Sequence, residues 1–320
     1  MNDALPEGDS PLRSIDAVEL GLSQAGYIAN RQISTAIYMA HHLQKPILVE
    51  GPAGVGKTEL AKSVASWLKL PLIRMQCYEG LDESKALYEW KYGKQLLYTQ
   101  ILKDKINYVI GDHDDLTMAL DKLHSFGDIF FSEEFLEPRP LLRSLQEPGG
   151  SVLLIDEIDK SDQEFEAFLL EILSDYQVTI PEIGTVSALV PPIVLLTSNS
   201  TRDLGDALKR RCLHLHIGFP EQRLEERIVE SRVPGISQTL RQQLVGFIHQ
   251  LRTLDLKKLP SVSETIDWAR VLVLLQANEL DHATVKDTLN VLLKYEADIE
   301  TALPQLTTFV AKAGRQGVFG

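Results

Sequence analysis

Short apolar runs separated by longer amphipathic segments are the clearest pattern in the first two thirds of the chain. Most of these runs are almost continuously hydrophobic, which is typical of parallel strands that are covered on both faces. The five runs of strand length are PILVE (46–50), PLIRMQC (71–77), SVLLIDE (151–157), PIVLLTSN (192–199) and LHLHIGF (213–219).

Helical periodicity marks the segments between these runs. Residues 15–43 are predicted to be helical, and TELAKSVASWLKL (58–70) places its apolar residues on one stripe. Another helix is predicted after Ser161, which stands three residues before Glu164 in the spacing of a capping box. Strands that alternate with helices in this way predict an α/β fold with a five-stranded parallel sheet between helices.

Strand patterns cease after Pro220. The rest of the chain has helical periodicity, with helices predicted at 221–231, 236–253, 263–278, 282–295 and 297–312. We therefore predict an α/β domain at 15–220 and an all-helical domain at 221–320. Residues 1–14, in which Pro and Gly stand among acids, are predicted to form a disordered N-terminus.

Two further segments lie inside the α/β part. Residues 83–135 form a long insertion between the second strand and the third, and their pattern is mostly helical. Within it, LYEWKYGKQLLY (87–98) mixes aromatic residues with lysines; this fits an exposed helix that faces a substrate, with internal packing as the alternative. Residues 175–192 are predicted to form a β-hairpin.

The bulk composition narrows the class of protein. The 320 residues are 44% hydrophobic and carry a formal net charge of −13, with a pI of about 5.1. Such an acidic chain is poorly suited to general binding of a phosphate backbone, so no nucleic acid is expected as a partner. Cys77 and Cys212 match no zinc or disulfide pattern, and no apolar run is long enough to span a membrane. Since the N-terminus also lacks the features of a signal peptide, we expect a cytoplasmic protein.

The octapeptide GPAGVGKT follows the first predicted strand and opens a helix, as the phosphate-binding P-loop pattern requires. Its glycines let backbone N–H groups face phosphate oxygens, and the start of the helix adds partial positive charge. Lys57 is expected to reach the β- and γ-phosphates of ATP, and the Thr58 hydroxyl to ligate Mg²⁺. The predicted nucleotide-binding residues of this loop are Gly51, Pro52, Ala53, Gly54, Val55, Gly56, Lys57 and Thr58.

Polar residues end two other predicted strands. Asp156 and Glu157 follow the run SVLLI, and Asn199 ends PIVLLTSN. Because ligands of α/β sheets bind at the carboxyl ends of the strands, Asp156 is expected to hold Mg²⁺ through water, together with Thr58. Glu157 is expected to activate the attacking water. Asn199 is expected to hydrogen-bond the γ-phosphate or that water.

A row of three cations, Lys209, Arg210 and Arg211, stands just before the last apolar run of this acidic chain. The residues alone leave three interpretations open. The row binds nucleic acid, forms a solvated helix end favoured by the helix dipole, or reaches into a neighbouring subunit.

In their order and spacing, the P-loop, the polar strand ends, the basic row and the helical C-terminal part resemble the AAA+ ATPases. The stretches KPILVEGPAGVGKTELAK, RPLLRSLQEPGGSVLLIDEIDKSDQEFEAFLLEILSDYQ and LLTSNSTRDLGDALKRRCLHLHIGFP are similar to MoxR-type members. Among these, the CoxD-like branch linked to carbon monoxide dehydrogenase maturation looks most similar. The resemblance spans most of the chain and implies a P-loop AAA+ core followed by an all-α lid.

The resemblance also implies a ring, expected to be a hexamer, with ATP and Mg²⁺ bound between subunits. The hairpin at 175–192 would then lie near the central pore, with plain packing as the alternative, and the helix at 87–98 would face the ring surface or a substrate. In such a ring Arg210 is the expected arginine finger that stabilises charge on the neighbour's γ-phosphoryl, and Arg211 is the alternative. It further implies a chaperone that matures a client metalloenzyme such as a molybdenum hydroxylase, with a von Willebrand A-domain protein as a partner. The rival functions are an AAA+ nucleic-acid motor or loader, and a nucleotide-binding scaffold that does not hydrolyse; Glu157 argues against the scaffold.

One position departs from the family pattern. Related lids carry a sensor arginine at the start of their third helix, and Thr265 stands there in SVSET (261–265). Arg270 lies five residues on, about 140° round a helix, and is a poor substitute. His214 and His216 alternate on the last predicted strand, which is expected to be buried, and they are expected to be structural.

Overall fold

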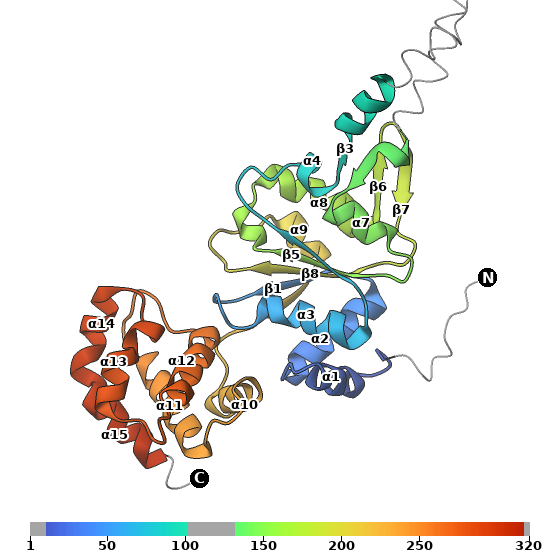
Figure 1. Ribbon diagram of the computed structural model, residues 1–320. Coiled ribbons are helices and arrows are strands. Elements are labelled where there is room, and N and C mark those ends of the chain that lie inside the picture. Colours follow the sequence, from blue (N-terminus) through green and yellow to red (C-terminus); the bar gives the residue numbers. More distant parts are fainter. Residues whose placement is uncertain (1–10, 101–131, 317–320) are drawn as a thin grey trace, which may run out of the picture.

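The computed structural model describes residues 11–100 and 132–316, which form an α/β part followed by a helical part (Figure 1). Most of the N-terminal segment predicted to be disordered, residues 1–10, lies outside the described ranges. Leu12 is buried, and the Ser14 side chain accepts a hydrogen bond from the Ala17 N–H at the start of α1 (Ile15–Gln24). Leu12 and Ser14 therefore have defined contacts.

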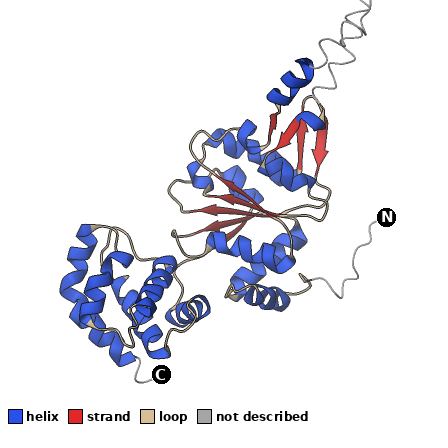
Figure 2. Ribbon diagram, in the orientation of Figure 1, coloured by secondary structure: helices blue, strands red, loops and turns tan. Residues whose placement is uncertain are grey.

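The five predicted strands form one sheet in the order β2-β5-β8-β1-β9. Their bounds are β1 Ile47–Glu50, β2 Leu72–Gln76, β5 Val152–Asp156, β8 Ile193–Ser198 and β9 Leu213–His216. Every neighbouring pair is parallel, so the carboxyl ends of all five strands meet at one edge (Figure 2). The predicted α/β fold with a five-stranded parallel sheet between helices is confirmed.

Helices cover both faces of this sheet. One face packs against α1, α2 (Arg31–Leu43) and α3 (Lys57–Leu68). The other face packs against α7 (Pro140–Gln146), α8 (Gln163–Asp175) and α9 (Asp206–Arg211). The strand interiors are therefore apolar on both sides, which explains their continuous hydrophobic runs.

The predicted start of α8 is wrong by one residue. Asp162, not Ser161, is the N-cap, and its side chain accepts a hydrogen bond from the Phe165 N–H. The Ser161 hydroxyl instead donates to the carbonyl of Ile158. Both residues are good N-cap types, and the tight turn after β5 decides between them.

The described ends of the 83–135 insertion are only partly helical. After α4 (Glu83–Ala86), strand β3 (Tyr88–Trp90) pairs antiparallel with β4 (Leu136–Pro138), which follows a 3₁₀ turn at Glu133–Phe135. Residues 92–100 are helical, and residues 101–131 lie outside the described ranges. The apolar residues of 87–98 do not share one buried face, because Leu87 and Trp90 are buried whereas Leu97 and Tyr98 are exposed. The hairpin predicted at 175–192 is present as β6 (Gln177–Ile180) and β7 (Gly184–Ser187).

The helical part has a separate core around Phe247 and Trp268. Its helices are α10 Gln222–Arg232, α11 Gln238–Leu251, α12 Val262–Leu274, α13 His282–Leu292, α14 Glu296–Ala302 and α15 Leu306–Gln316. The single helix predicted at 297–312 is in fact two, separated by a 3₁₀ turn that contains Pro304. The lid-like helical part is confirmed, while the domain boundary near Pro220 stays a prediction. Across the described ranges, no helix is both long and apolar enough to cross a membrane.

Candidate functional site

The loop between β1 and α3 has a backbone that requires glycine. Gly51, Gly54 and Gly56 have φ angles of 150°, 74° and 100°. A Cβ on Gly51 would lie 2.0 Å from the carbonyl oxygen of Ile217, and one on Gly54 would lie 2.3 Å from the Ser261 hydroxyl. The glycines therefore allow close approach to the end of β9 and to the helical part, and they curl the loop over the start of α3. Of the other loop residues predicted to bind nucleotide, Val55 is buried, whereas Ala53 is exposed and Pro52 half-buried.

Lys57 lies inside this loop. Its buried Nζ donates to the carbonyl oxygens of Gly51 and Pro52, at 2.7 Å each, and to Asn199 Oδ1 at 2.8 Å. Burial lowers the pKa of Lys57, while the nearby carboxylates of Asp159, Asp156 and Glu157 act in the opposite direction. The ammonium group is thus held at the mouth of the loop by acceptors that a phosphate oxygen can replace.

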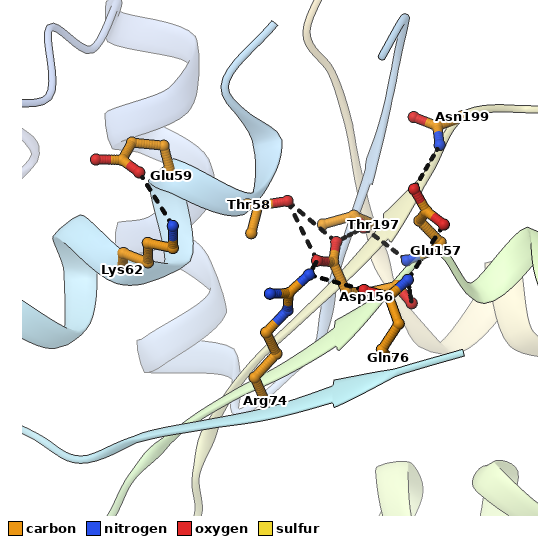
Figure 3. Close-up of polar contacts among 9 residues, drawn as sticks. All are labelled: Thr58, Glu59, Lys62, Arg74, Gln76, Asp156, Glu157, Thr197 and Asn199. Carbon is orange, nitrogen blue, oxygen red and sulfur yellow. Dashed lines mark hydrogen bonds and ion pairs between the residues drawn. The ribbon is translucent and has the colours of Figure 1, made fainter. Parts of the chain in front are cut away.

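Asp156 ends β5 beside the start of α3 (Figure 3). Its Oδ1 accepts hydrogen bonds from Thr197 Oγ1 at 2.6 Å and from Thr58 Oγ1 at 3.1 Å. Its Oδ2 accepts from Arg74 Nη2 at 2.7 Å. The carboxylate is almost fully buried, and every partner comes from a different element, namely β8, α3 and β2.

Glu157 follows in a left-handed conformation with φ of 56°, which is unusual for a residue with a side chain. Its N–H donates to Thr197 Oγ1 at 2.9 Å, so one hydroxyl connects Glu157 to the Asp156 carboxylate. Its carboxylate accepts from Gln76 Nε2 at 3.1 Å and from Asn199 Nδ2 at 3.3 Å (Figure 3). The backbone turn and these two amides together hold the carboxylate between the end of β2 and the loop after β8.

Asp159, in the turn after β5, binds the loop that follows β8. Its carboxylate accepts from the N–H groups of Asn199 and Thr201 and from the Thr201 hydroxyl. Burial opposes the charged form, but these hydrogen bonds prevail and hold the pKa of Asp159 below its usual range. Asp159 thereby fixes the loop after β8 and the position of Asn199.

The donor set fits Mg²⁺. A hydroxyl of Thr58 and a carboxylate of Asp156 lie in contact beside the phosphate-binding loop, and Mg²⁺ in nucleotide sites takes few protein oxygens, with water and phosphate completing its shell. The described residues include no cluster of three or more His, Cys, Asp or Glu that could hold a metal ion. Thr58 and Asp156 are therefore the residues that would hold the ion.

A cavity of about 670 Å³ opens beside the loop, between the α/β part and the helical part. Its lining includes Tyr27, Gly56, Phe219 and Ile228. A cavity of this size, lined by apolar and polar residues, can hold a nucleotide-sized ligand. The helical part contacts the loop directly, because the Ser263 N–H donates to the Gly54 carbonyl at 3.2 Å.

Two oppositely charged side chains also connect the two parts. Arg232, the last residue of α10, forms an ion pair of 2.8 Å with Glu59 in the first turn of α3. Both residues line the cavity. The helical part thus rests on the same helix that carries Lys57 and Thr58.

The basic row ends α9, away from the Asp156 cluster in sequence and in its contacts. Arg211 donates to Ser174 Oγ at 2.6 Å and to the Ala207 carbonyl. Arg210 is exposed, and it forms no hydrogen bond or ion pair with the part of the chain that the structure describes. The Arg211 side chain is therefore held by its own chain, whereas the Arg210 side chain has no such contact among the described residues; their catalytic roles stay predictions.

Two expectations about the remaining polar residues change. His214 and His216 lie on the edge strand β9 and are exposed, so the expectation of a buried strand is wrong for these two side chains; His214 pairs with Glu50. Thr265 is fully buried on α12 and donates to Glu225, so it does not face the cavity. Arg270 does line the cavity and pairs with Asp267 on its own helix.

Sequence reasoning missed several residues of the site. Arg74 and Gln76 are polar alternate positions in PLIRMQC, and that period of two is the signal that could have placed them on one face of the strand. Thr197 stands two residues before Asn199 at the end of a buried strand. Asp159 repeats the acidic pattern of IDEID.

Comparisons with known proteins agree with this site. A family model described as AAA domain (dynein-related subfamily) matches residues 46–212, from the start of β1 to the end of α9. An uncharacterized protein of Staphylococcus epidermidis is 26% identical over 238 residues, which cover 72% of this chain and 76% of that protein. An uncharacterized protein of Staphylococcus aureus (strain USA300) is 26% identical over 240 residues, with the same coverage of both chains.

Proposed function

The chain belongs to the AAA domain family, dynein-related subfamily, and on that premise we propose that it is a MoxR-type AAA+ ATPase that hydrolyses ATP with Mg²⁺ in a ring. The observation that carries this proposal is the meeting of Lys57, Thr58, Asp156, Glu157 and Asn199 at the carboxyl edge of the sheet. These residues come from three separate segments of the chain. A phosphate-binding loop alone requires Lys57 and Thr58 but not Asp156, Glu157 or Asn199.

Each of these residues has a role that its contacts support. Lys57 would exchange the loop carbonyls for the β- and γ-phosphate oxygens. Asp156 and Thr58 would hold Mg²⁺, which when bound neutralises charge on the phosphates. Glu157 would take a proton from the attacking water as the bond between the γ-phosphorus and the leaving ADP oxygen breaks.

Asn199 connects the phosphate-binding lysine with the glutamate that activates water. Its amide accepts from Lys57 with one atom and donates to Glu157 with the other. A γ-phosphate that draws Lys57 away would free the Asn199 oxygen and alter its hold on Glu157. Asn199 would thereby position Glu157 according to whether a γ-phosphate is present.

A ring is proposed because the resemblance to AAA+ ATPases implies an ATP site between subunits, in which the neighbour supplies a cation to the γ-phosphate. Arg210, exposed at the end of α9, would supply that charge to the neighbouring subunit. We propose a hexamer by the same resemblance. The client is proposed to be a metalloenzyme under maturation, with a von Willebrand A-domain protein as partner, on the similarity of the motif stretches to MoxR-type and CoxD-like proteins.

The test of hydrolysis compares two variants with the wild type. Glu157→Gln is expected to bind ATP and to accumulate in the ATP-bound ring without turnover, because an amide still accepts a hydrogen bond but takes no proton. Lys57→Ala is expected to lose nucleotide binding altogether. Calorimetry and steady-state phosphate release separate the two, and wild-type turnover in Glu157→Gln would remove the assigned role.

A further inference from the structure

Arg74 on β2 binds the carboxylate that is proposed to hold Mg²⁺. Its Nη2 donates to Asp156 Oδ2 and to Gln76 Oε1, at 2.7 Å each (Figure 3). The register places Gln76 opposite Asp156 and Arg74 opposite Leu154 two residues earlier. Arg74, Gln76 and Asp156 therefore project from the same face of the sheet, toward α3. The contact follows from the strand pairing and not from one side chain's rotamer alone.

The charge balance of Asp156 depends on this contact. The Asp156 side chain is 5% exposed, and an unpaired carboxylate at that depth is costly. Lys57, the other nearby cation, points its Nζ at the carbonyls of the loop and at Asn199. Among residues 11–100 and 132–316, Arg74 is the ion-pair partner of Asp156.

We propose that Arg74 is a positioning residue that holds the Asp156 carboxylate between nucleotide-binding events and gives it up when Mg²⁺ binds. This inference rests on the proposed function. Thr58 donates to both oxygens of Asp156 and Thr197 donates to Oδ1, so Arg74 is the charged partner of Oδ2. A divalent cation, or water bound to it, needs the lone pairs of Oδ2 that Arg74 now uses. The cation also repels the guanidinium at close range.

The exposure of the two partners decides which one moves. Arg74 is 49% exposed and extends from the outermost strand of the sheet, so its charge can turn into water at little cost. Asp156 is fixed by the Thr58 and Thr197 hydroxyls and has no such freedom. Arg74 thus competes with Mg²⁺ and sets the concentration of the ion at which the nucleotide site fills.

The experiment is a titration of Mg²⁺ into the full-length protein with fluorescent N-methylanthraniloyl ADP, read as fluorescence anisotropy, so that turnover plays no part. Arg74→Met keeps the length of the side chain and removes its charge. Lys62→Met is the matched control, because Lys62 is similarly exposed on α3 and pairs with Glu59 instead of Asp156. Arg74→Lys keeps the charge without the planar fork.

We expect Arg74→Met to lower the half-saturating Mg²⁺ concentration about two- to fivefold, the range of a partly exposed ion pair. Lys62→Met should match the wild type, and Arg74→Lys should lie between the wild type and Arg74→Met. An unchanged or raised half-saturation in Arg74→Met would overturn the inference, as would a lysine variant that behaves like the methionine variant. Absence of Mg²⁺-dependent nucleotide binding in the wild type would instead overturn the proposed function, and this inference with it.

Discussion

Asp156 in the α/β part and Glu225 in the helical part are both buried carboxylates, and each is bound by an arginine and by threonine hydroxyls, two at Asp156 and one at Glu225. Glu225 is fully buried, and Arg252 binds both of its oxygens, at 2.6 and 2.8 Å, from a side chain that is only 7% exposed. Thr265 and His249 complete its shell, at 2.7 and 2.9 Å. The partners come from α11 and α12, so Glu225 on α10 joins three helices.

The arginine makes the difference between the two sites. Arg74 donates to Asp156 through one nitrogen, and its side chain is half exposed. Arg252 donates to Glu225 through two nitrogens, and its side chain is buried. A single exposed contact can be exchanged for a ligand, while a bidentate buried one cannot be released without leaving a charge unpaired. The same residue types therefore serve exchange at the sheet edge and fixed geometry in the helical part.

The largest effect is expected from Arg210, a cation that belongs to neither the Asp156 site nor the Glu225 site. Arg210→Ala should lose about 10³–10⁵ in the rate of hydrolysis and keep nucleotide binding, because Arg210 has no stabilising contact within its own described subunit. Steady-state ATPase assays and calorimetry check both parts. Mixed rings of Arg210→Ala and Lys57→Ala should regain activity, since some interfaces then combine an intact loop with an intact Arg210. Full activity of Arg210→Ala alone would move the assignment to Arg211.

The second prediction sets the two arginines against each other in stability. Arg252→Met should lower the free energy of unfolding by about 3–5 kcal/mol, because Glu225 remains buried without its partner. Arg74→Met should cost no more than about 1 kcal/mol, since that pair is half exposed. Urea denaturation without nucleotide measures both. Equal losses would show that exposure does not separate the two sites.

The smallest expected effect is a loss of stability of the helical part at acid pH. Burial opposes the charged form of Glu225, but the hydrogen bonds from His249 and Arg252 prevail and lower its pKa from the usual 4.5. A carboxylate with a lowered folded-state pKa adds stability that is complete above the unfolded value and is lost as the pH falls below it. The helical part should therefore weaken below about pH 4.5, and Glu225→Gln should show a smaller acid-induced loss.

The tryptophans allow this to be measured in the helical part alone. Trp268 is fully buried there, and the other two, Trp67 and Trp90, lie in the α/β part and can be replaced by Phe. Fluorescence of Trp268 during urea unfolding, repeated from pH 7 to pH 3, gives the profile and covers the fall through the lowered pKa of Glu225. An identical profile in Glu225→Gln would assign the acid sensitivity to other groups.

Much of the fold was predictable because its signals are local. Continuous apolar runs gave the five strands, and the loop sequence GPAGVGKT placed the turn between β1 and α3. The insertion was harder, since a short strand such as β3 has too few residues to show a period. The apolar residues of 87–98 therefore suggested one helix where a strand and a helix share them.

The sequence by itself determined the P-loop that carries Lys57 and Thr58, and the strand ends at which Asp156, Glu157 and Asn199 stand. Only the tertiary structure decided which neighbours complete them. Strand order places β2 beside β5, and register then brings Arg74 to Asp156 and Gln76 to Glu157. Thr265 likewise turned inward because Glu225 lies across the helical core. Periodicity reports which face of an element is buried, but pairing between distant segments depends on how the elements pack, and no local pattern encodes that.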